Sequence, residues 1–347
     1  MGDYETFIES EEFYKEGCIN LMVFPSCPIK VVTTEAIKEY VSDYNEKHDV
    51  KIHYPMGETM DFKTYTEALE LVEDIDRYPD VILQCDYKSI FAPNFIRFRE
   101  AGHFVDVLRD GEVHPFYQSF DYQDPKGVYT LLGTSFPIIV VDKTILGGLP
   151  VPKSFRDLLD PIYRGKISIH GHGTSSCDMS IMMHIHQLYG KEAMLTFAES
   201  IHSLRHFSSV VKDIGKGKAE LPPIGIIPDM FKDLILRKPQ TEVVWPEDGS
   251  PLFPLWMTVK KKKVQEAKDL IDFITGPLMG QLWASASFAS RRPDVKNNQY
   301  DGIPVHFIGW DAIYRDIFRT KTEMEEEVLG IIRGYDQDKS ERPRLIC

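Results

Sequence analysis

Short apolar runs that stop at a proline or a turn alternate along this chain with segments of helical periodicity. Three runs have the length and composition of buried strands: Cys18 to Phe24, Val50 to Tyr54 and Pro79 to Cys85. Apolar residues from Ala36 to Tyr44 fall on one helical face between the first two runs. Thr64 to Glu67 has the form of a helix N-terminal capping box between the second and third runs. This order predicts a parallel sheet with crossover helices, and therefore an α/β fold.

The same alternation resumes in the second part of the chain. Strands are expected at Pro137 to Val141, Lys166 to His170 and Val243 to Trp245. Helices are expected at Pro152 to Leu159, after Gly173, from Val264 to Ile274 and from about Asp311 to Gly334. No repeat and no low-complexity linker separates the two parts, which argues against two domains joined by a flexible segment.

The composition limits the partners of this chain. The 347 residues are 43% hydrophobic, which is enough apolar material for two cores, and the formal net charge is −13. Such an acidic chain is a poor binder of nucleic-acid backbones. We expect the one basic run, Lys260 to Lys263, to be solvated surface.

The sequence also bears on the compartment. No apolar segment approaches the roughly 20 residues that span a bilayer, so we expect no membrane insertion. The first residues are mixed and acidic, without an apolar leader, and the five cysteines are odd in number and lack C-x-x-C spacing. Free thiols in a cytoplasmic protein are therefore expected, or a periplasmic or extracellular protein if a leader has been removed.

A series of segments adds a resemblance to a known family. The segments are Pro79 to Ile82, Tyr129 to Gly133, Pro152 to Pro161 continuing into Tyr163 to Ile167, Trp245 to Ser250, and Ala267 to Ile274 followed by Gly280-Gln281. In this order and spacing, roughly residues 18 to 295 resemble the extracellular solute-binding proteins of ABC transporters. The resemblance is to the group with the periplasmic-binding-protein type II fold, which includes ferric-iron binders.

The resemblance implies a two-lobed α/β fold with a ligand cleft between the lobes. Lobe 1 would comprise residues 1–133 and 254–347, including C-terminal helices that pack back as a lid, and lobe 2 residues 134–253. The chain would cross between lobes twice, near Gly133 to Phe136 and near Ser250 to Pro254. The implied function is a non-catalytic, monomeric binder of a small-molecule or metal ligand, which serves ABC transporter components.

Two features depart from that family. The export signal is missing, and no two tyrosines are adjacent, although the ferric binders resemble one another in an adjacent tyrosine pair that holds iron through phenolate oxygens. The fold is still implied, whereas ferric iron as the ligand is not.

Ligands of open α/β sheets bind beyond the carboxyl ends of the strands. The candidate ligand-binding residues at those ends are Ser26, Cys27, Cys85, Asp86, Thr134, Ser135, His172, Thr174, Ser175, Ser176 and Cys177. Thiolate and imidazole groups suit transition metals such as iron, nickel, zinc or copper, or a metallocofactor. Cys27, Cys85 and Cys177, with His172, therefore form the predicted metal set, drawn from both lobes.

Other interpretations of the same residues stay open. The glycines and hydroxyls from Gly171 to Ser176 stand at a helix start and equally suit a small oxyanion or carboxylate, and an anionic metal complex would use both kinds of donor. His202 and His206 are four residues apart and could share a metal, but structural positions are favoured, as they are for His184 and His186.

An enzyme on the same fold, similar to the thiamin pyrimidine synthases, is the alternative class of function. This chain lacks the cysteine-rich run of those enzymes. It also offers no set of nucleophile, base and orienting group, so we expect no catalytic residues.

Overall fold

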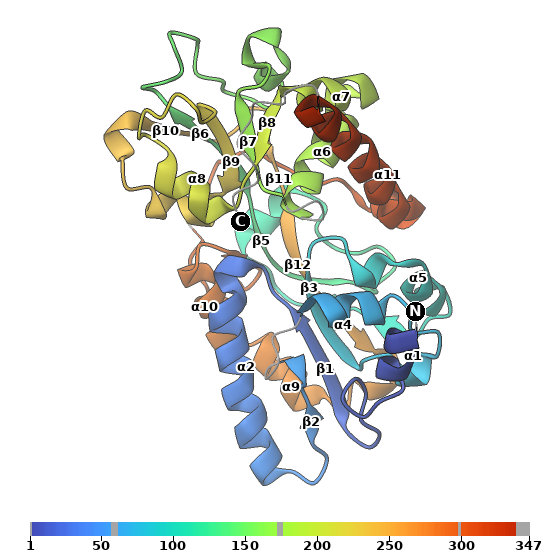
Figure 1. Ribbon diagram of the computed structural model, residues 1–347. Coiled ribbons are helices and arrows are strands. Elements are labelled where there is room, and N and C mark those ends of the chain that lie inside the picture. Colours follow the sequence, from blue (N-terminus) through green and yellow to red (C-terminus); the bar gives the residue numbers. More distant parts are fainter. Residues whose placement is uncertain (1, 57–61, 172–175, 298–299, 338–347) are drawn as a thin grey trace. The chain divides into compact units, whose positions relative to one another are not determined.

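The computed structural model describes residues 2–56, 62–171, 176–297 and 300–337 (Figure 1). The chain divides into two compact units. Unit 1 comprises Met1–Thr134 and Pro254–Asp301, and unit 2 comprises Ser135–Phe253 and Gly302–Cys347. The two-lobed α/β fold that the resemblance implied is confirmed.

Unit 1 is built on a mixed sheet in the order β13-β5-β12-β3-β1-β2, with β4 paired to β12. The strands are β1 (Ile19–Phe24), β2 (Ile52–His53), β3 (Val81–Cys85), β4 (Phe104–Val105), β5 (Thr130–Ser135), β12 (Phe253–Lys260) and β13 (Ala289–Ser290). β1 is parallel to both β2 and β3, as the alternation of strands and helices predicts. β12 runs antiparallel to β3 because the chain returns to this sheet from unit 2.

Helices cover both faces of this sheet (Figure 1). They are α1 (Gly2–Ile8), α2 (Cys27–Lys47), α4 (Phe62–Leu69), α5 (Pro93–Glu100), α9 (Lys268–Ile274) and α10 (Pro277–Ser285). α10 packs on α2, where the indole Nε1 of Trp283 donates a hydrogen bond to Thr33 Oγ1 at 2.9 Å. Both side chains are buried, so the hydrogen bond satisfies polar groups that would otherwise be costly to bury.

Unit 2 has a five-stranded sheet in the order β10-β6-β9-β7-β8. The strands are β6 (Pro137–Asp142), β7 (Ile167–Ile169), β8 (Ile201–Leu204), β9 (Ile224–Pro228) and β10 (Thr241–Val244), and a separate short pair is formed by β11 (Ser250–Pro251) and β14 (Val305–His306). β7 is parallel to β8 and β9, whereas β6 is antiparallel to β9. The central strands β6, β7 and β9 are buried along their whole length.

The helices of unit 2 are α6 (Ser176–Tyr189), α7 (Lys191–Ser200), α8 (Phe207–Asp213) and α11 (Trp310–Gln337). α11 packs on α6 and α7 (Figure 1). Its buried apolar stripe includes Ile313, Ile317 and Val328. The C-terminal helix therefore belongs to unit 2, and not to lobe 1 as expected. The chain consequently passes between the units three times instead of twice, with the third passage between Asp301 and Gly302.

Two expected helices differ from those observed. Thr64 and Glu67 lie inside α4, which begins at Phe62, so the predicted capping box is not a helix start. Pro152 to Leu159 forms only a 3-10 turn, over Asp157–Leu159. The two backbone amides before this turn bind a residue distant in sequence. The Asp248 carboxylate accepts hydrogen bonds from the amides of Phe155 and Arg156.

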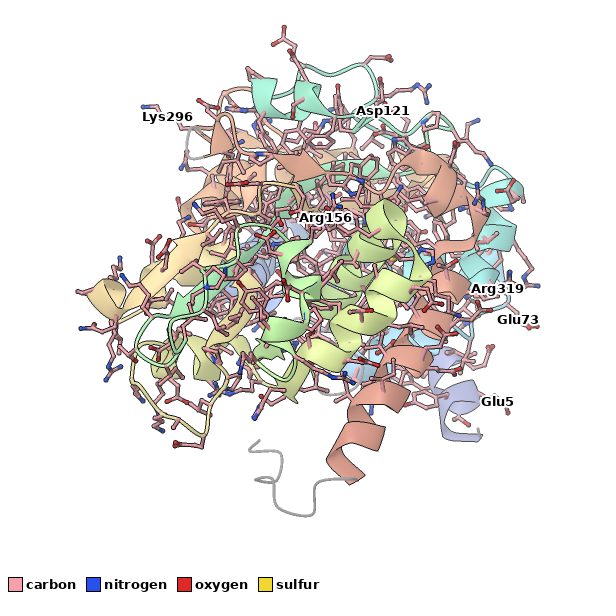
Figure 2. The ribbon with its side chains drawn as sticks, turned by 90° about the horizontal axis from the view of Figure 1, so that it is seen from above. Glu5, Glu73, Asp121, Arg156, Lys296 and Arg319 are labelled. Carbon is pink, nitrogen blue, oxygen red and sulfur yellow. The ribbon has the colours of Figure 1, made fainter. Side chains whose placement is uncertain are left out.

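Charged side chains cover the surface, as the exposed Glu5, Glu73, Asp121 and Lys296 illustrate (Figure 2). None of the described helices combines the length and the hydrophobicity that a bilayer span requires.

The first residue of the basic run, Lys260, is an exception to the expected surface exposure. Lys260 ends β12 and is only 1% exposed, so the prediction of a fully solvated run is wrong at this residue.

Candidate functional site

The carboxyl ends of β1 and β3 meet at one edge of the unit 1 sheet. Four residue pairs, from Leu21–Val81 to Phe24–Gln84, hold the two strands in parallel register. Beyond that register, the Ser26 amide donates a hydrogen bond to Cys85 Sγ at 3.3 Å. Ser26 and Cys85, two predicted site residues that are 59 positions apart, are therefore in contact.

α2 begins at this edge, with Ser26 as its N-cap residue. The Ser26 side chain makes no capping hydrogen bond within the described chain, and the first turn contains no acidic residue. Pro28 has no N–H, and the Ile29 amide returns to the Ser26 carbonyl at 3.1 Å. The positive end of a 21-residue helix thus offers the Cys27 amide as a donor, whereas the Ser26 hydroxyl is buried beside Cys85.

The two cysteines of this edge have different environments. Cys27 is exposed in the first turn of α2, whereas Cys85 is buried. Burial raises the pKa of the Cys85 thiol to about 12. A protonated thiol is a poor metal ligand, because the thiolate is the form that binds metals. Cys85 therefore has the properties of a packed core residue in unit 1.

Asp86 and Thr134 are also buried in unit 1. Asp86 has a φ of 68°, in the left-handed region that is unfavourable for residues other than glycine. Its amide donates to the Pro254 carbonyl at 2.8 Å, which joins the end of β3 to the start of β12. Thr134 is paired with Ala289 of β13 and lies at the boundary with Ser135, the first residue of unit 2. Strained backbone at a strand end is a common feature of functional sites.

The unit 2 sheet has a comparable carboxyl edge. β7 and β8 end side by side, and the Arg205 amide donates to the Ile169 carbonyl at 2.8 Å. His170 follows β7, and its ring stacks on Phe207 at 4.2 Å and meets His206 edge-to-face at 5.3 Å between ring centroids. The Arg205 guanidinium is neutralised by Asp213 at 2.6 Å. The edge therefore presents two imidazoles backed by an aromatic ring.

His206 caps α8, and this role determines the nitrogen that carries its proton. Its Nδ1 accepts from the Ser208 amide at 3.2 Å. In the neutral ring, the proton must then reside on Nε2, which is left as a donor. Structural positions were expected for His202 and His206, although their spacing would allow a shared metal on one helix. His202 lies in β8, and His206 is the N-cap residue of α8.

The other predicted site residues of unit 2 lie largely outside the structural description. His172, Thr174 and Ser175 fall among residues that the structure does not describe, and Ser176 and Cys177 are placed only as the first residues of α6. Within the described residues, no three His, Cys, Asp or Glu side chains gather as a metal site requires. The metal set of Cys27, Cys85, Cys177 and His172 stays a prediction.

One close pair of titratable groups was not anticipated. His184 of α6 and His306 of β14 approach to 3.1 Å between their Nδ1 atoms. His184 is fully buried against Phe155. The two histidines are 122 positions apart, so no local pattern could have paired them. They join α6 to the β14 segment within unit 2.

Comparisons with known proteins agree with this architecture. No curated protein matches the chain in sequence. Among solved structures, the apo ferric ion-binding protein A of Pasteurella haemolytica is 15% identical with a TM-score of 0.63, covering 91% of this chain and 98% of that one. An ABC transporter structure from Clostridium perfringens is 15% identical with a TM-score of 0.62, covering 90% and 99%.

A third similar structure is the periplasmic binding protein AfuA of Actinobacillus pleuropneumoniae with fructose-6-phosphate bound. It is 16% identical with a TM-score of 0.60, covering 90% of this chain and 99% of that one. At such identities, these likenesses concern the fold alone. The model of a protein family described as bacterial extracellular solute-binding protein matches residues 76–316, which is more than half of the chain. The chain therefore belongs to the family of bacterial extracellular solute-binding proteins.

Proposed function

We propose that this chain is the non-catalytic solute-binding component of an ABC transporter. Family membership supports solute binding, and the similar structures include an ABC transporter and periplasmic binding proteins. The family description is extracellular, which does not support the cytoplasmic location expected from the sequence. We accordingly place the protein outside the cytoplasmic membrane in this proposal.

We further propose that the solute carries a phosphate or carboxylate group that binds at the N-terminus of α2. The observation that carries this proposal is the position of that helix start at the joint carboxyl edge of β1 and β3, with no acidic residue in the first turn of the helix and no side-chain cap. A helix dipole and amide donors favour an anion there.

Ferric iron is a less suitable ligand for these residues. Two buried tyrosines use their hydroxyls to donate to backbone carbonyls, Tyr117 to Ala289 and Tyr129 to Ile90. Burial raises the pKa of Tyr117 and of Tyr129 well above the usual range, which disfavours the phenolate that would bind iron. The similar AfuA structure holds a sugar phosphate, which agrees with an anionic solute.

The first prediction tests the α2 site with Ser26→Asp. An acidic N-cap satisfies the helix start and repels an incoming anion, so folding stability should be retained while affinity for an anionic solute falls at least tenfold. Calorimetric titration with fructose 6-phosphate, and separately with citrate as a carboxylate, measures the affinity. Thermal unfolding measures the stability.

Ser42→Asp is the matched control, because Ser42 is exposed in the middle of α2 and the substitution changes the charge equally. It should leave both affinities within twofold of the original protein. If neither anion binds and ferric citrate or zinc binds instead, the metal set is the better proposal. Release of a chemically altered solute would contradict the non-catalytic assignment.

A further inference from the structure

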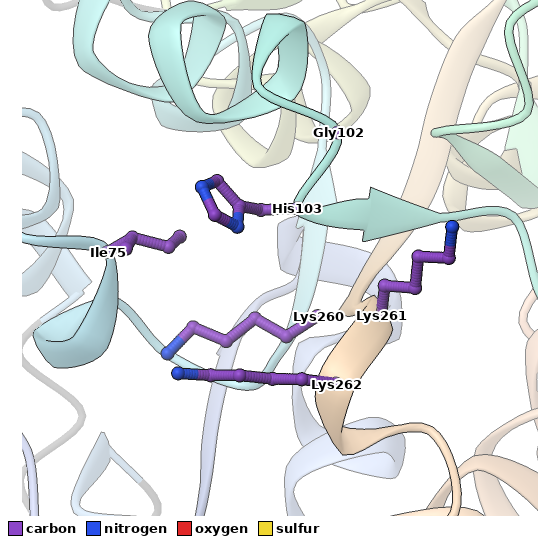
Figure 3. A pocket seen from close by; sticks show the side chains of 6 residues that line it. All are labelled: Ile75, Gly102, His103, Lys260, Lys261 and Lys262. Atoms are coloured by element: carbon purple, nitrogen blue, oxygen red, sulfur yellow. The ribbon is translucent and has the colours of Figure 1, made fainter.

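A pocket of about 280 Å³ lies at the opposite edge of the unit 1 sheet from the α2 site. It is lined by Ile75, Gly102, His103, Lys260, Lys261 and Lys262 (Figure 3). Lys260 ends β12 beside the start of β3, since Val259 is paired with Val81. Cys85 ends β3 four residues further on, so at about 3.3 Å per residue the two sites are roughly 13 Å apart.

The ammonium group of Lys260 is buried between the Asp80 carboxylate and the Tyr14 ring, whose centroid lies 5.4 Å from Nζ. Its side chain is 1% exposed, and Nζ lies 3.3 Å from Asp80 Oδ1 as an ion pair. That contact lacks hydrogen-bond geometry, and no described atom accepts a hydrogen bond from Nζ. The other Asp80 oxygen accepts from the Asn20 amide at 2.9 Å. A buried ammonium has three N–H donors, and leaving them without acceptors is unfavourable.

Lys260 and Lys262 extend toward the same end of the pocket, below Ile75 and His103, whereas Lys261 points to the other side (Figure 3). Lys262 is held in place by an ion pair with Asp76. The pKa of Lys260 is lowered, mainly by burial and in part by the charge of Lys262, while Asp80 and Asp76 oppose the shift. At this end of the pocket, Lys260 and Lys262 are each paired with one carboxylate, Asp80 and Asp76, and His103 lines the same pocket.

We propose that this pocket is a second binding site of the protein, specific for a small oxyanion of the phosphate class. Phosphate oxygens would accept hydrogen bonds from Lys260 and Lys262 at once. His103 lines the same pocket and would be the third donor. The pocket has room for a phosphate or a small phosphate monoester, but not for a folded acidic partner.

This inference does not depend on the proposed solute site. It would give the protein a phosphate-sensing or phosphate-stabilised site in unit 1, apart from the α2 edge. The shared chemistry is a phosphoryl group, which free phosphate and phosphate monoesters both supply.

The second prediction measures this binding by calorimetry and ³¹P NMR on the full chain. Inorganic phosphate and glycerol 3-phosphate are titrated separately, with chloride matching the ionic strength. Lys262→Gln should weaken phosphate binding at this site at least tenfold, because it removes one positive charge and leaves the Asp76 charge uncompensated. Tighter binding of glycerol 3-phosphate than of phosphate would identify a monoester as the better ligand, and the reverse order would identify free phosphate.

Lys263→Gln is the matched control, since Lys263 belongs to the same basic run but pairs with Glu266 and does not line the pocket. It should change phosphate affinity less than twofold. Ser26→Asp should also leave this site intact, which separates it from the α2 site.

Removal of Lys260 alone would leave the Asp80 charge buried and could unfold the protein. The double substitution Lys260→Met with Asp80→Asn removes both charges, keeps the fold accessible and should abolish the site. The proposal is overturned if phosphate does not bind saturably to the Ser26→Asp variant, in which the α2 site is blocked. Equal phosphate affinity of the original protein, Lys262→Gln and the double variant would overturn it as well.

Discussion

Individual buried polar residues mark the places where this chain departs from a simple apolar core. Asp86 is fully buried with a positive φ, and Cys85 beside it carries a thiol whose pKa is raised to about 12 by burial. The burial of both residues follows from the position of β3 in the middle of the unit 1 sheet, where the end of β3 is covered by the start of β12. The strain at Asp86 is therefore maintained by its neighbours in the sheet.

The His184–His306 contact gives the third prediction. Burial, and then the charge of His306, lower the pKa of His184 to about 3, compared with an ordinary value of 6.5. The folded state therefore keeps His184 neutral, while the unfolded chain takes up a proton below pH 6.5. The stability associated with this residue is present above pH 6.5 and is lost as the pH falls toward 3. Below pH 6.5, this residue should lower the free energy of unfolding by about 1.4 kcal/mol for each pH unit of acidification.

Urea unfolding between pH 7 and pH 5 measures this dependence. His184→Gln should flatten it, because the unfolded chain then has no proton to gain at this position. His186→Gln, at a half-exposed position two residues further along α6, should keep the slope of the original protein. An unchanged slope in His184→Gln would show that other groups dominate the acid sensitivity.

At the scale of elements, the position of α11 differs most from expectation. Its apolar residues recur at helical spacing and are buried: Ile313, Ile317, Met324, Val328 and Ile332. Such a stripe requires an apolar partner, and α6 and α7 of unit 2 provide it. Lys191 of α7 adds an exposed ion pair to Glu327 of α11, which contributes little by comparison.

The fourth prediction tests this packing. Ile317→Ala removes a side chain that is 3% exposed and should lower the free energy of unfolding by about 2–4 kcal/mol. Hydrogen exchange should increase in α6 and α7, and not in the unit 1 sheet. Arg319→Ala, on the exposed face of the same helix, should change stability by less than about 0.5 kcal/mol. Faster exchange in unit 1 would contradict the assignment of α11 to unit 2.

At the scale of the whole molecule, both units are discontinuous in sequence. β12, which lies between β5 and β3, comes from the chain after residue 253, and so does β13. Unit 2 likewise depends on β14 and α11 from the C-terminal segment. Unit 1 cannot complete its sheet, and unit 2 cannot complete its β11–β14 pair and its core, until most of the chain is available.

The fifth prediction follows from this connectivity. The fragment 1–253 should lack a cooperative unfolding transition, because unit 1 has lost a central strand and unit 2 a packed helix. Mixing it with the fragment 254–347 should restore a transition and the near-ultraviolet circular dichroism of the intact protein. Cooperative unfolding of 1–253 alone would mean that the C-terminal segment is dispensable for one of the units.

The local elements and the class of fold were determined by the sequence itself. β1, β3 and β6 are short apolar runs bounded by prolines, and a run of that kind has few alternatives to a buried strand. The parallel pairing of β1 with β2 and β3 follows from the helices that separate them, because parallel neighbours need a crossover.

Only the tertiary structure decided which chemical groups meet and which are buried. Lys260 belongs to a basic run that appears solvated in sequence, yet its place at the end of β12 buries it beside Asp80, 180 positions earlier. Ser26 meets Cys85 across 59 positions, and His184 meets His306 across 122. The physical reason is that strand order and helix packing are set by non-local burial of apolar surface, and no residue's local pattern encodes its distant partner.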